Sequence, residues 1–429
     1  MIGAPGFKLD TRAVQFSREV PIAAEGGPWQ VSIENTQPST RRIPPRRGKF
    51  PVQDIKVTPA TRSSRSACRL VLIFACGVWG SACSPDGAPN RSAEVAAARP
   101  GQASSQSQSP APDAPPIRWV GLIGEYGPDD DIRLILEDDS RLHLRQGELA
   151  YPLEESSADE FLGRPSGGES VERLLFTRRG DGRAADFQWG GASFTKRETG
   201  AVGGETFRID PVRDVERLRI EALAALPPME EGPFRESDLV DLTSLDPTIE
   251  LDIRYATTNN FMNAVFYEES RAFLQRPAAD AVVRAHRALA SSGYGLLIHD
   301  GYRPWYVTKM FWDATPTHQR EFVANPASGS RHNRGAAVDL SLYDLAAGES
   351  VEMPGSYDEF SHRSYSNYPG GTALQRWHRA LLRQVMEAEG FTVNSGEWWH
   401  FDYRDWREYG IQNEVFGEID ASSEAATAR

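Results

Sequence analysis

Two short segments, far apart along the chain, constrain this sequence more than any other feature. Residues 330–339 read Ser-Arg-His-Asn-Arg-Gly-Ala-Ala-Val-Asp, and residues 397–400 read Glu-Trp-Trp-His. Together they supply two imidazoles, from His332 and His400, and two carboxylates. Two histidines and one carboxylate leave the fourth position of a tetrahedral Zn²⁺ open, as in catalytic zinc sites. The pattern predicts a fold that brings both segments to one cation.

The residues that follow Gly335 have the alternation of a half-buried strand. Small or polar positions alternate with branched apolar ones from residue 336 to 342. Asp339 should therefore lie on one face of this strand. The turn at residues 333–335 should bring His332 back toward it, so that both side chains reach the same cation.

The second segment also reads as a strand, entered through the turn residues 394–396. In a regular strand, a separation of three residues puts Glu397 and His400 on opposite faces. We therefore predict that Glu397 lies in the entry turn or in a β-bulge, beside the metal and free to move protons. The expected ligands are then His332, Asp339 and His400.

Two further segments give these motifs more weight, since a single His-Asp pair or a lone Glu-x-x-His is usually structural. Residues 300–304 read Asp-Gly-Tyr-Arg-Pro, and residues 252–261 read Asp-Ile-Arg-Tyr-Ala-Thr-Thr-Asn-Asn-Phe. With all four segments in this order, the chain over roughly residues 236–412 resembles the zinc D-alanyl-D-alanine dipeptidases of the vancomycin-resistance type. These belong to the wider superfamily of zinc D-Ala-D-Ala peptidases.

The fold class expected for this region is α+β. Helical periodicity over residues 278–292 and 373–389, and a buried strand at 296–299, are mixed without a repeating βαβ order. The resemblance implies the matching architecture, which is a central, mainly antiparallel sheet flanked by helices.

The resemblance also implies a reaction. A zinc-bound water would attack D-alanyl-D-alanine and release two molecules of D-alanine, with one Zn²⁺ in each catalytic domain. Glu397 would act as the general base. Arg303 would stabilise the negative charge that develops on the carbonyl oxygen.

Substrate contacts are implied at two positions. Asp358 matches the family residue that contacts the substrate amine, and Ser330 matches a serine implicated in substrate contact. Asp344 and Glu359 are competing choices for the amine site, because they are acids close to Asp358 in the sequence.

Two alternatives to the dipeptidase stay open. One is a D,D-carboxypeptidase or another peptidoglycan peptidase of the same superfamily. The other is a non-catalytic, zinc-containing binding module. Asp358 bears on the first choice, since a long peptidoglycan stem would offer no free amine there. Glu397 and Arg303 speak against the second, because a binding module needs neither.

A chain of 429 residues is too long for one ordinary core, so several regions are expected. We predict seven segments in order: 1–56, a disordered or mis-annotated N-terminal extension; 57–83, a signal peptide; 84–116, a flexible linker; 117–199, a small all-β accessory domain; 200–235, a helical connector; 236–412, the catalytic domain; and 413–429, a disordered C-terminal tail.

Export is expected from the signal-like segment, in which an apolar core at residues 70–79 follows basic residues and precedes small ones. Cys83 resembles the lipidated cysteine of a bacterial lipoprotein, although Gly80 stands where that motif usually has leucine. We therefore expect a periplasmic protein, with membrane attachment through Cys83 as one form. A formal net charge of −13 and the lack of a basic stripe argue against a nucleic-acid partner.

Overall fold

The computed structural model describes residues 110–164, 170–199 and 206–419, and these fall within one compact unit. The predicted extension at 1–56, the signal peptide at 57–83 with Cys83, and most of the linker lie outside the described residues. Residues 110–116, the described end of the linker, contain no helix or strand.

A region of eight strands follows, from Gly124 to Thr195, where a small all-β domain was expected. Its eight strands pair antiparallel in chain order, and a bridge from Tyr126 to Lys196 joins the first strand to the residue after the last, which makes the sheet barrel-like. Its interior is filled by aromatic and aliphatic side chains such as Tyr126, Phe161 and Phe187. The elements are α1 Ile117–Val120, β1 Gly124–Tyr126, β2 Arg133–Asp138, β3 Arg141–Gln146, β4 Leu149–Ser157, β5 Glu160–Gly163, β6 Glu172–Arg178, β7 Ala184–Trp189 and β8 Ala192–Thr195.

A second sheet organises the rest of the chain. Its strands run in the order β10-β12-β13-β16-β15, with β14 paired to β13, and the β10–β12 pair is parallel while the others are antiparallel. Two more strands, β9 Leu239–Asp241 and β11 Phe273–Gln275, form a separate antiparallel pair. The mainly antiparallel sheet agrees with the expected α+β class. The strands are β10 Glu250–Leu251, β12 Tyr294–Asp300, β13 Ala337–Asp344, β14 Glu349–Ser350, β15 Phe391–Asn394 and β16 Glu397–Tyr403.

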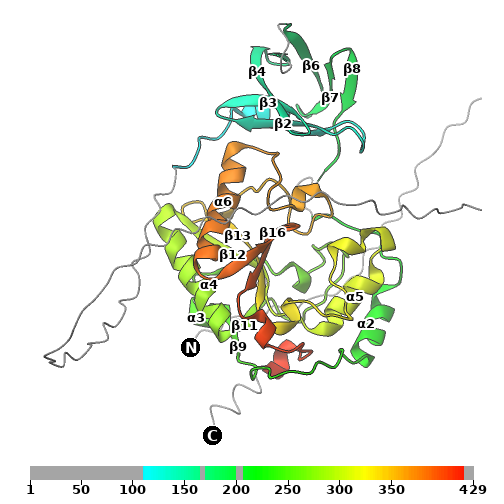
Figure 1. Cartoon of the computed structure of the whole chain (residues 1–429), viewed down its shortest axis with the longest axis vertical. Coiled ribbons are helices and arrows are strands. Elements are labelled where there is room, and N and C mark those ends of the chain that lie inside the picture. Colours follow the sequence, from blue (N-terminus) through cyan, green and yellow to red (C-terminus); the bar gives the residue numbers. More distant parts are fainter. Residues whose placement is uncertain (1–109, 165–169, 200–205, 420–429) are drawn as a thin grey trace, which may run out of the picture. The chain divides into compact units, whose positions relative to one another are not determined.

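Helices flank this sheet, with α4 and α6 on one side and α2 and α5 on the other (Figure 1). Helix α6 begins with a capping box, in which Thr372 and Gln375 each bond the other's backbone N–H, so its start is fixed by sequence. The α-helices are α2 Val215–Ala224, α3 Leu242–Leu245, α4 Arg276–Leu289, α5 Trp305–Ala314 and α6 Ala373–Ala388; the 3₁₀ turns are η1 Arg254–Ala256, η2 Ala290–Ser292, η3 Thr317–Phe322, η4 His332–Arg334, η5 His362–Ser364 and η6 Trp406–Glu408.

The hydrophobic core around this second sheet extends past both boundaries predicted for the domain. Leu218 and Ala222 of α2 are buried in that core, so the described part of the predicted connector packs as part of the domain. At the other end, Phe416 and Ile419 are each only 6% exposed, although a disordered tail was predicted from residue 413. The ring of Phe416 lies 4.9 Å from that of Tyr267, and this contact orders the chain there. Residues 420–429 lie outside the described part.

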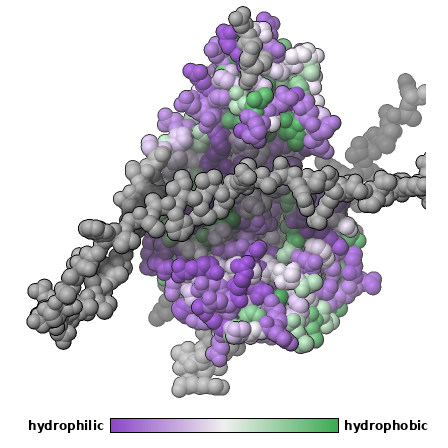
Figure 2. Space-filling model, viewed as in Figure 1, coloured by the Kyte–Doolittle hydropathy of each residue, from purple (hydrophilic) through white to green (hydrophobic). Residues whose placement is uncertain are grey.

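The described surface is mainly hydrophilic in the view of Figure 2, with smaller apolar patches between the polar regions. None of the helices in the described ranges is long and apolar enough to span a membrane.

Candidate metal centre and active site

The sheet itself brings the central carboxylate and one imidazole together. Asp339 on β13 lies directly opposite His400 on β16 and opposite Asp300 on β12. Directly opposed residues on antiparallel strands have Cβ atoms roughly 4.5–5.5 Å apart. Asp339 therefore sits in the middle of a row of three polar side chains that crosses three neighbouring strands.

The second imidazole comes from the turn before β13. His332 starts η4, and Gly335 ends this turn with φ +66°, a left-handed conformation that suits glycine. A Cβ atom at Gly335 would also lie 2.4 Å from Leu239 Cδ2. The tight turn delivers the chain into β13 and returns the His332 ring over Asp339, as predicted.

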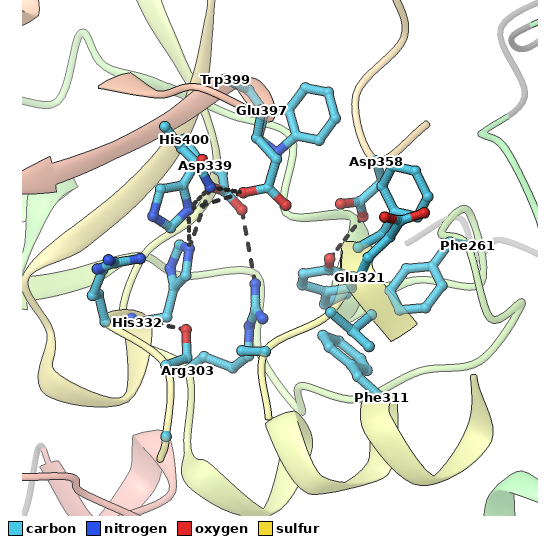
Figure 3. A pocket seen from close by; sticks show the side chains of 18 of the residues that line it. Phe261, Arg303, Phe311, Glu321, His332, Asp339, Asp358, Glu397, Trp399 and His400 are labelled. Carbon is cyan, nitrogen blue, oxygen red and sulfur yellow. Dashed lines mark hydrogen bonds and ion pairs between the residues drawn. The ribbon is translucent and has the colours of Figure 1, made fainter. Parts of the chain in front are cut away.

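Three buried ligand atoms converge: His332 Nε2, His400 Nδ1 and Asp339 Oδ1 (Figure 3). The two ring nitrogens are 3.0 Å apart, and Asp339 Oδ1 is 3.0 Å from His400 Nδ1 and 3.3 Å from His332 Nε2. Tetrahedral Zn²⁺ with bonds near 2.0–2.1 Å requires ligand atoms about 3.3 Å apart. The spacing and the donor set therefore fit a divalent metal ion.

Outer groups fix which nitrogen of each ring is free to bind. His332 Nδ1 lies 2.7 Å from the Gly301 carbonyl oxygen, and His400 Nε2 lies 2.9 Å from Asp402 Oδ1. A carbonyl oxygen and a carboxylate can only accept, so these two nitrogens carry the protons. The lone pairs of His332 Nε2 and His400 Nδ1 are left facing the metal position, as outer partners of metal-binding histidines commonly arrange.

Electrostatics within the cluster are strong because all three groups are buried. Burial alone would raise the pKa of Asp339, but the facing imidazoles of His332 and His400 hold it well below its usual range. Burial would lower the pKa of His400, yet the carboxylates of Asp339 and Asp402 raise it to about 10. The site thus attracts positive charge, and protons and a metal cation compete for it.

Glu397 stands beside the ligands. It is the first residue of β16, where the pairing with β15 shifts register between Val393 and Asn394, so the predicted irregularity at the strand entry is confirmed. Its Oε2 lies 3.7 Å from His400 Nδ1 and accepts a hydrogen bond of 2.8 Å from Asn394 Nδ2. Burial raises the pKa of Glu397 above that of an ordinary glutamate.

Arg303 points into the same cluster (Figure 3). Its Nε and Nη2 contact Asp300 Oδ2 at 2.9 and 2.7 Å, and Nη2 is 3.7 Å from Asp339 Oδ2. Tyr267 donates a hydrogen bond to the other oxygen of Asp300 at 2.8 Å. A buried and doubly held carboxylate therefore fixes the guanidinium next to the metal position.

A family model described as D-ala-D-ala dipeptidase (Peptidase M15) matches residues 235–416. A D-alanyl-D-alanine dipeptidase of Escherichia coli is 33% identical over 180 residues, which covers 42% of this chain and 92% of that protein. Proteins with the same name from Enterococcus faecium and Enterococcus faecalis are 35% and 34% identical, each match covering 37% of this chain and 87% of the relative. The chain belongs to this dipeptidase family. It is accordingly a hydrolase of the metallopeptidase class.

Asp358, the residue expected to contact the substrate amine, lies across the pocket from His332 (Figure 3). Asp358 is 8% exposed, adopts φ +59°, and accepts a 2.7 Å hydrogen bond from the Tyr255 hydroxyl. Burial is the main cause that raises the pKa of Asp358 to about 8. The two competing acids lie elsewhere: Asp344 caps the backbone of Ala346, and Glu359 contacts Arg363.

Ser330 borders the cavity but also has a local role. Its Oγ accepts a 3.2 Å hydrogen bond from the His332 backbone, and its own N–H donates to Asn333 Oδ1 at 2.7 Å. These bonds stabilise the turn that carries His332. The cavity measures about 390 Å³ and is bordered by the cluster, Glu397, Asp358, Ser330, and aromatic side chains that include Phe261, Phe311 and Phe360.

Sequence reasoning missed the residues that orient the site. Tyr357 donates a 3.3 Å hydrogen bond to Asp339 Oδ2, and Tyr255, Asp300 and Asp402 hold Asp358, Arg303 and His400 respectively. The i,i+3 spacing of the Asp300–Arg303 pair was a signal available in the sequence. The i,i+2 spacing of His400 and Asp402 was another, because residues two apart on a strand share a face. The Tyr255–Asp358 and Tyr357–Asp339 contacts depend on tertiary folding.

Proposed function

We propose that this protein is a zinc D,D-dipeptidase that hydrolyses D-alanyl-D-alanine to two molecules of D-alanine. One observation carries the proposal. Three ligand atoms lie 3.0–3.3 Å from one another, and the carboxylate of Glu397, 3.7 Å from His400 Nδ1, is left over beside them. A purely structural metal site has no use for a second carboxylate that stands beside the ion without binding it.

His332, Asp339 and His400 would hold the zinc ion. When bound there, zinc supplies Lewis acidity, which acidifies water and polarises a carbonyl group. Glu397 would take the proton from the attacking water and pass it to the leaving amine. Its raised pKa suits this exchange, because a base with a higher pKa takes up a proton more readily.

Arg303 would face the oxygen on which negative charge develops. Its side chain is 9% exposed and is held by Asp300, so its charge is oriented before the substrate arrives. Asp358 would receive the substrate ammonium at the other side of the cavity. A buried carboxylate with a raised pKa gains most from a cation that binds next to it.

The deciding experiment couples metal analysis to an amine-release assay. We expect about one zinc ion per chain and release of D-alanine from D-Ala-D-Ala in a purified preparation. A pentapeptide stem that ends in D-Ala-D-Ala should be a poor substrate. Preference for the stem would instead favour a D,D-carboxypeptidase, and zinc binding without hydrolysis of either compound would favour a binding module.

Export and lipidation at Cys83 remain part of the proposal, supported by the signal-like sequence around residues 57–83. Expression in a bacterial host and membrane fractionation test them. We expect the wild-type chain in the membrane fraction and the Cys83→Ser variant in the periplasmic fluid. Equal distribution of the two proteins would argue against lipidation.

A further inference from the structure

A dipeptide carries a carboxylate as well as an ammonium group. If the protein is the proposed dipeptidase, Asp358 accounts for the ammonium and Arg303 for the carbonyl oxygen. Neither role accounts for the C-terminal carboxylate, which must leave water when the substrate enters the cavity. A buried carboxylate needs a partner that donates hydrogen bonds, and a cation is the strongest such partner.

Three arginines border the cavity in the described part of the chain: Arg303, Arg331 and Arg334. Arg303 is tied to Asp300 beside the metal position. Arg334 is paired with Glu230 at 2.5 Å and also donates to the Tyr409 carbonyl oxygen at 2.5 Å. These two guanidinium groups therefore already have their own partners.

Arg331 differs from both. Its side chain is 44% exposed, and its Nε lies 3.1 Å from Asp402 Oδ2. Its guanidinium carbon lies 4.9 Å from the centre of the Trp406 ring, which also borders the cavity. Within the described residues, neither terminal nitrogen of Arg331 donates a hydrogen bond to another residue. They are the pair of parallel donors that suits a carboxylate.

Asp402 links this arginine to the metal centre. One of its oxygens lies 2.9 Å from His400 Nε2, and the other contacts Arg331 Nε. A single carboxylate thus holds a metal-binding imidazole and a guanidinium at a fixed separation. Because the guanidinium is also stacked on Trp406, less conformational freedom is lost when it binds a ligand.

We propose that Arg331 binds the C-terminal carboxylate of the dipeptide, with Asp402 and Trp406 holding its guanidinium in place. This assignment rests on the proposed function and deepens it. His332, the neighbour of Arg331 in sequence, and Asp358 lie on opposite sides of the cavity (Figure 3). Asp358 and Arg331 would then select a substrate whose ammonium and carboxylate groups are separated by the length of a dipeptide.

The test compares two substrates, D-Ala-D-Ala and its C-terminal amide, with three proteins: wild type, Arg331→Gln and Arg407→Gln. Arg407 is the matched control, because its guanidinium stacks on the same Trp406 ring at 4.1 Å but it does not border the cavity. Loss of a charged hydrogen-bond pair should lower kcat/KM of the Arg331 variant for the free acid about 10- to 100-fold, mainly through KM. Its kcat/KM for the amide should stay the same.

Wild type should therefore prefer the acid to the amide, and Arg331→Gln should not. Where the amide turns over too slowly, calorimetric binding of both compounds in a Glu397→Gln background gives the same comparison. Equal losses for acid and amide, or no loss in the Arg331 variant, would overturn the assignment. The zinc content of each protein is measured as well and should be the same in all three. If Arg331→Gln binds less zinc and loses kcat/KM equally for the acid and the amide, Arg331 only supports His400 and does not bind the substrate. Failure of the dipeptidase proposal shows separately, as absent hydrolysis by wild type.

Discussion

The two ends of the cavity are built differently. At the metal end, every ligand is held by a second group: Gly301 for His332, Asp402 for His400, and Tyr357 for Asp339. At the amine end, Asp358 meets the hydroxyl of Tyr255 and, among the described residues, no ion-pair partner. Its pKa rises to about 8, mainly through burial.

The two ends therefore obtain their compensating positive charge from different sources. Under the proposed function, the metal end is oriented in advance for a resident cation, while the amine end leaves a buried carboxyl group to be paired by the ligand. Changes at the metal end should therefore abolish the reaction, and changes at the amine end should alter affinity and its pH dependence.

Glu397→Ala should show the largest effect on chemistry at the metal end. Removal of a general base typically costs about 100- to 10,000-fold in turnover. Zinc should remain bound, whereas His332→Ala should lose it, and metal analysis distinguishes the two variants. Glu349→Ala, an exposed acid on β14, is the control. Unchanged hydrolysis in Glu397→Ala would remove the proposed mechanism.

The pH profile sharpens this assignment. Because burial raises the pKa of Glu397, its base form is lost at a higher pH than that of an exposed glutamate. As the pH is lowered, turnover of the wild type should therefore begin to decline at a pH at which an exposed glutamate is still ionised. An acidic limb at the pKa of an ordinary glutamate would speak against Glu397 as the group that titrates.

Arg303→Lys should cause the second-largest loss of turnover. Lysine keeps the charge but cannot reproduce the contacts of Nε and Nη2 with Asp300, so the charge near the carbonyl oxygen is misplaced. Loss of such a donor typically costs about 100- to 1,000-fold in kcat. Steady-state kinetics should show a loss in kcat with KM nearly unchanged. A purely structural salt bridge would lower thermal stability and leave kcat near the wild-type value.

Asp358→Asn tests the amine end, where we expect KM to rise about 10- to 100-fold with a smaller change in kcat. In the wild type, Asp358 becomes ionised only as the pH approaches about 8, so KM should fall as the pH rises toward that value. The asparagine variant should lose this part of the pH dependence. Asp344→Asn removes a partly buried acid that caps a turn and should behave as wild type.

Tyr255→Phe should have the smallest effect. The hydroxyl donates to Asp358 and lowers its pKa against the effect of burial. Without it the pKa of Asp358 should rise further, and KM below pH 8 should increase by about 2- to 10-fold. If KM stays constant between wild type and variant across this range, Tyr255 does not tune the carboxyl group.

Prediction from sequence succeeded where a periodic pattern or a motif determines structure locally. The strand after Gly335 and the helix at 373–389 appear as β13 and α6. Strand β4 was missed because Pro152 and the polar run at residues 154–157 hide its alternation. Helix α5 was missed since its side chains are buried nearly all round and show little helical periodicity.

The candidate site divides in the same way. The spacing of the motifs was enough to propose His332, Asp339, His400 and Glu397 as a group. Arg331 was not predicted to have a role, because its contact with Asp402 depends on how the η4 turn approaches β16.

The row of Asp300, Asp339 and His400 across β12, β13 and β16 ties the chemistry to strand pairing. A slip of one residue between two of these strands would turn the slipped side chains to the opposite face. A misaligned sheet would then separate the three ligand residues, and the proposed metal site would be lost. Metal binding would thus stabilise only chains whose strands are paired in the correct register, and it would favour that register during folding.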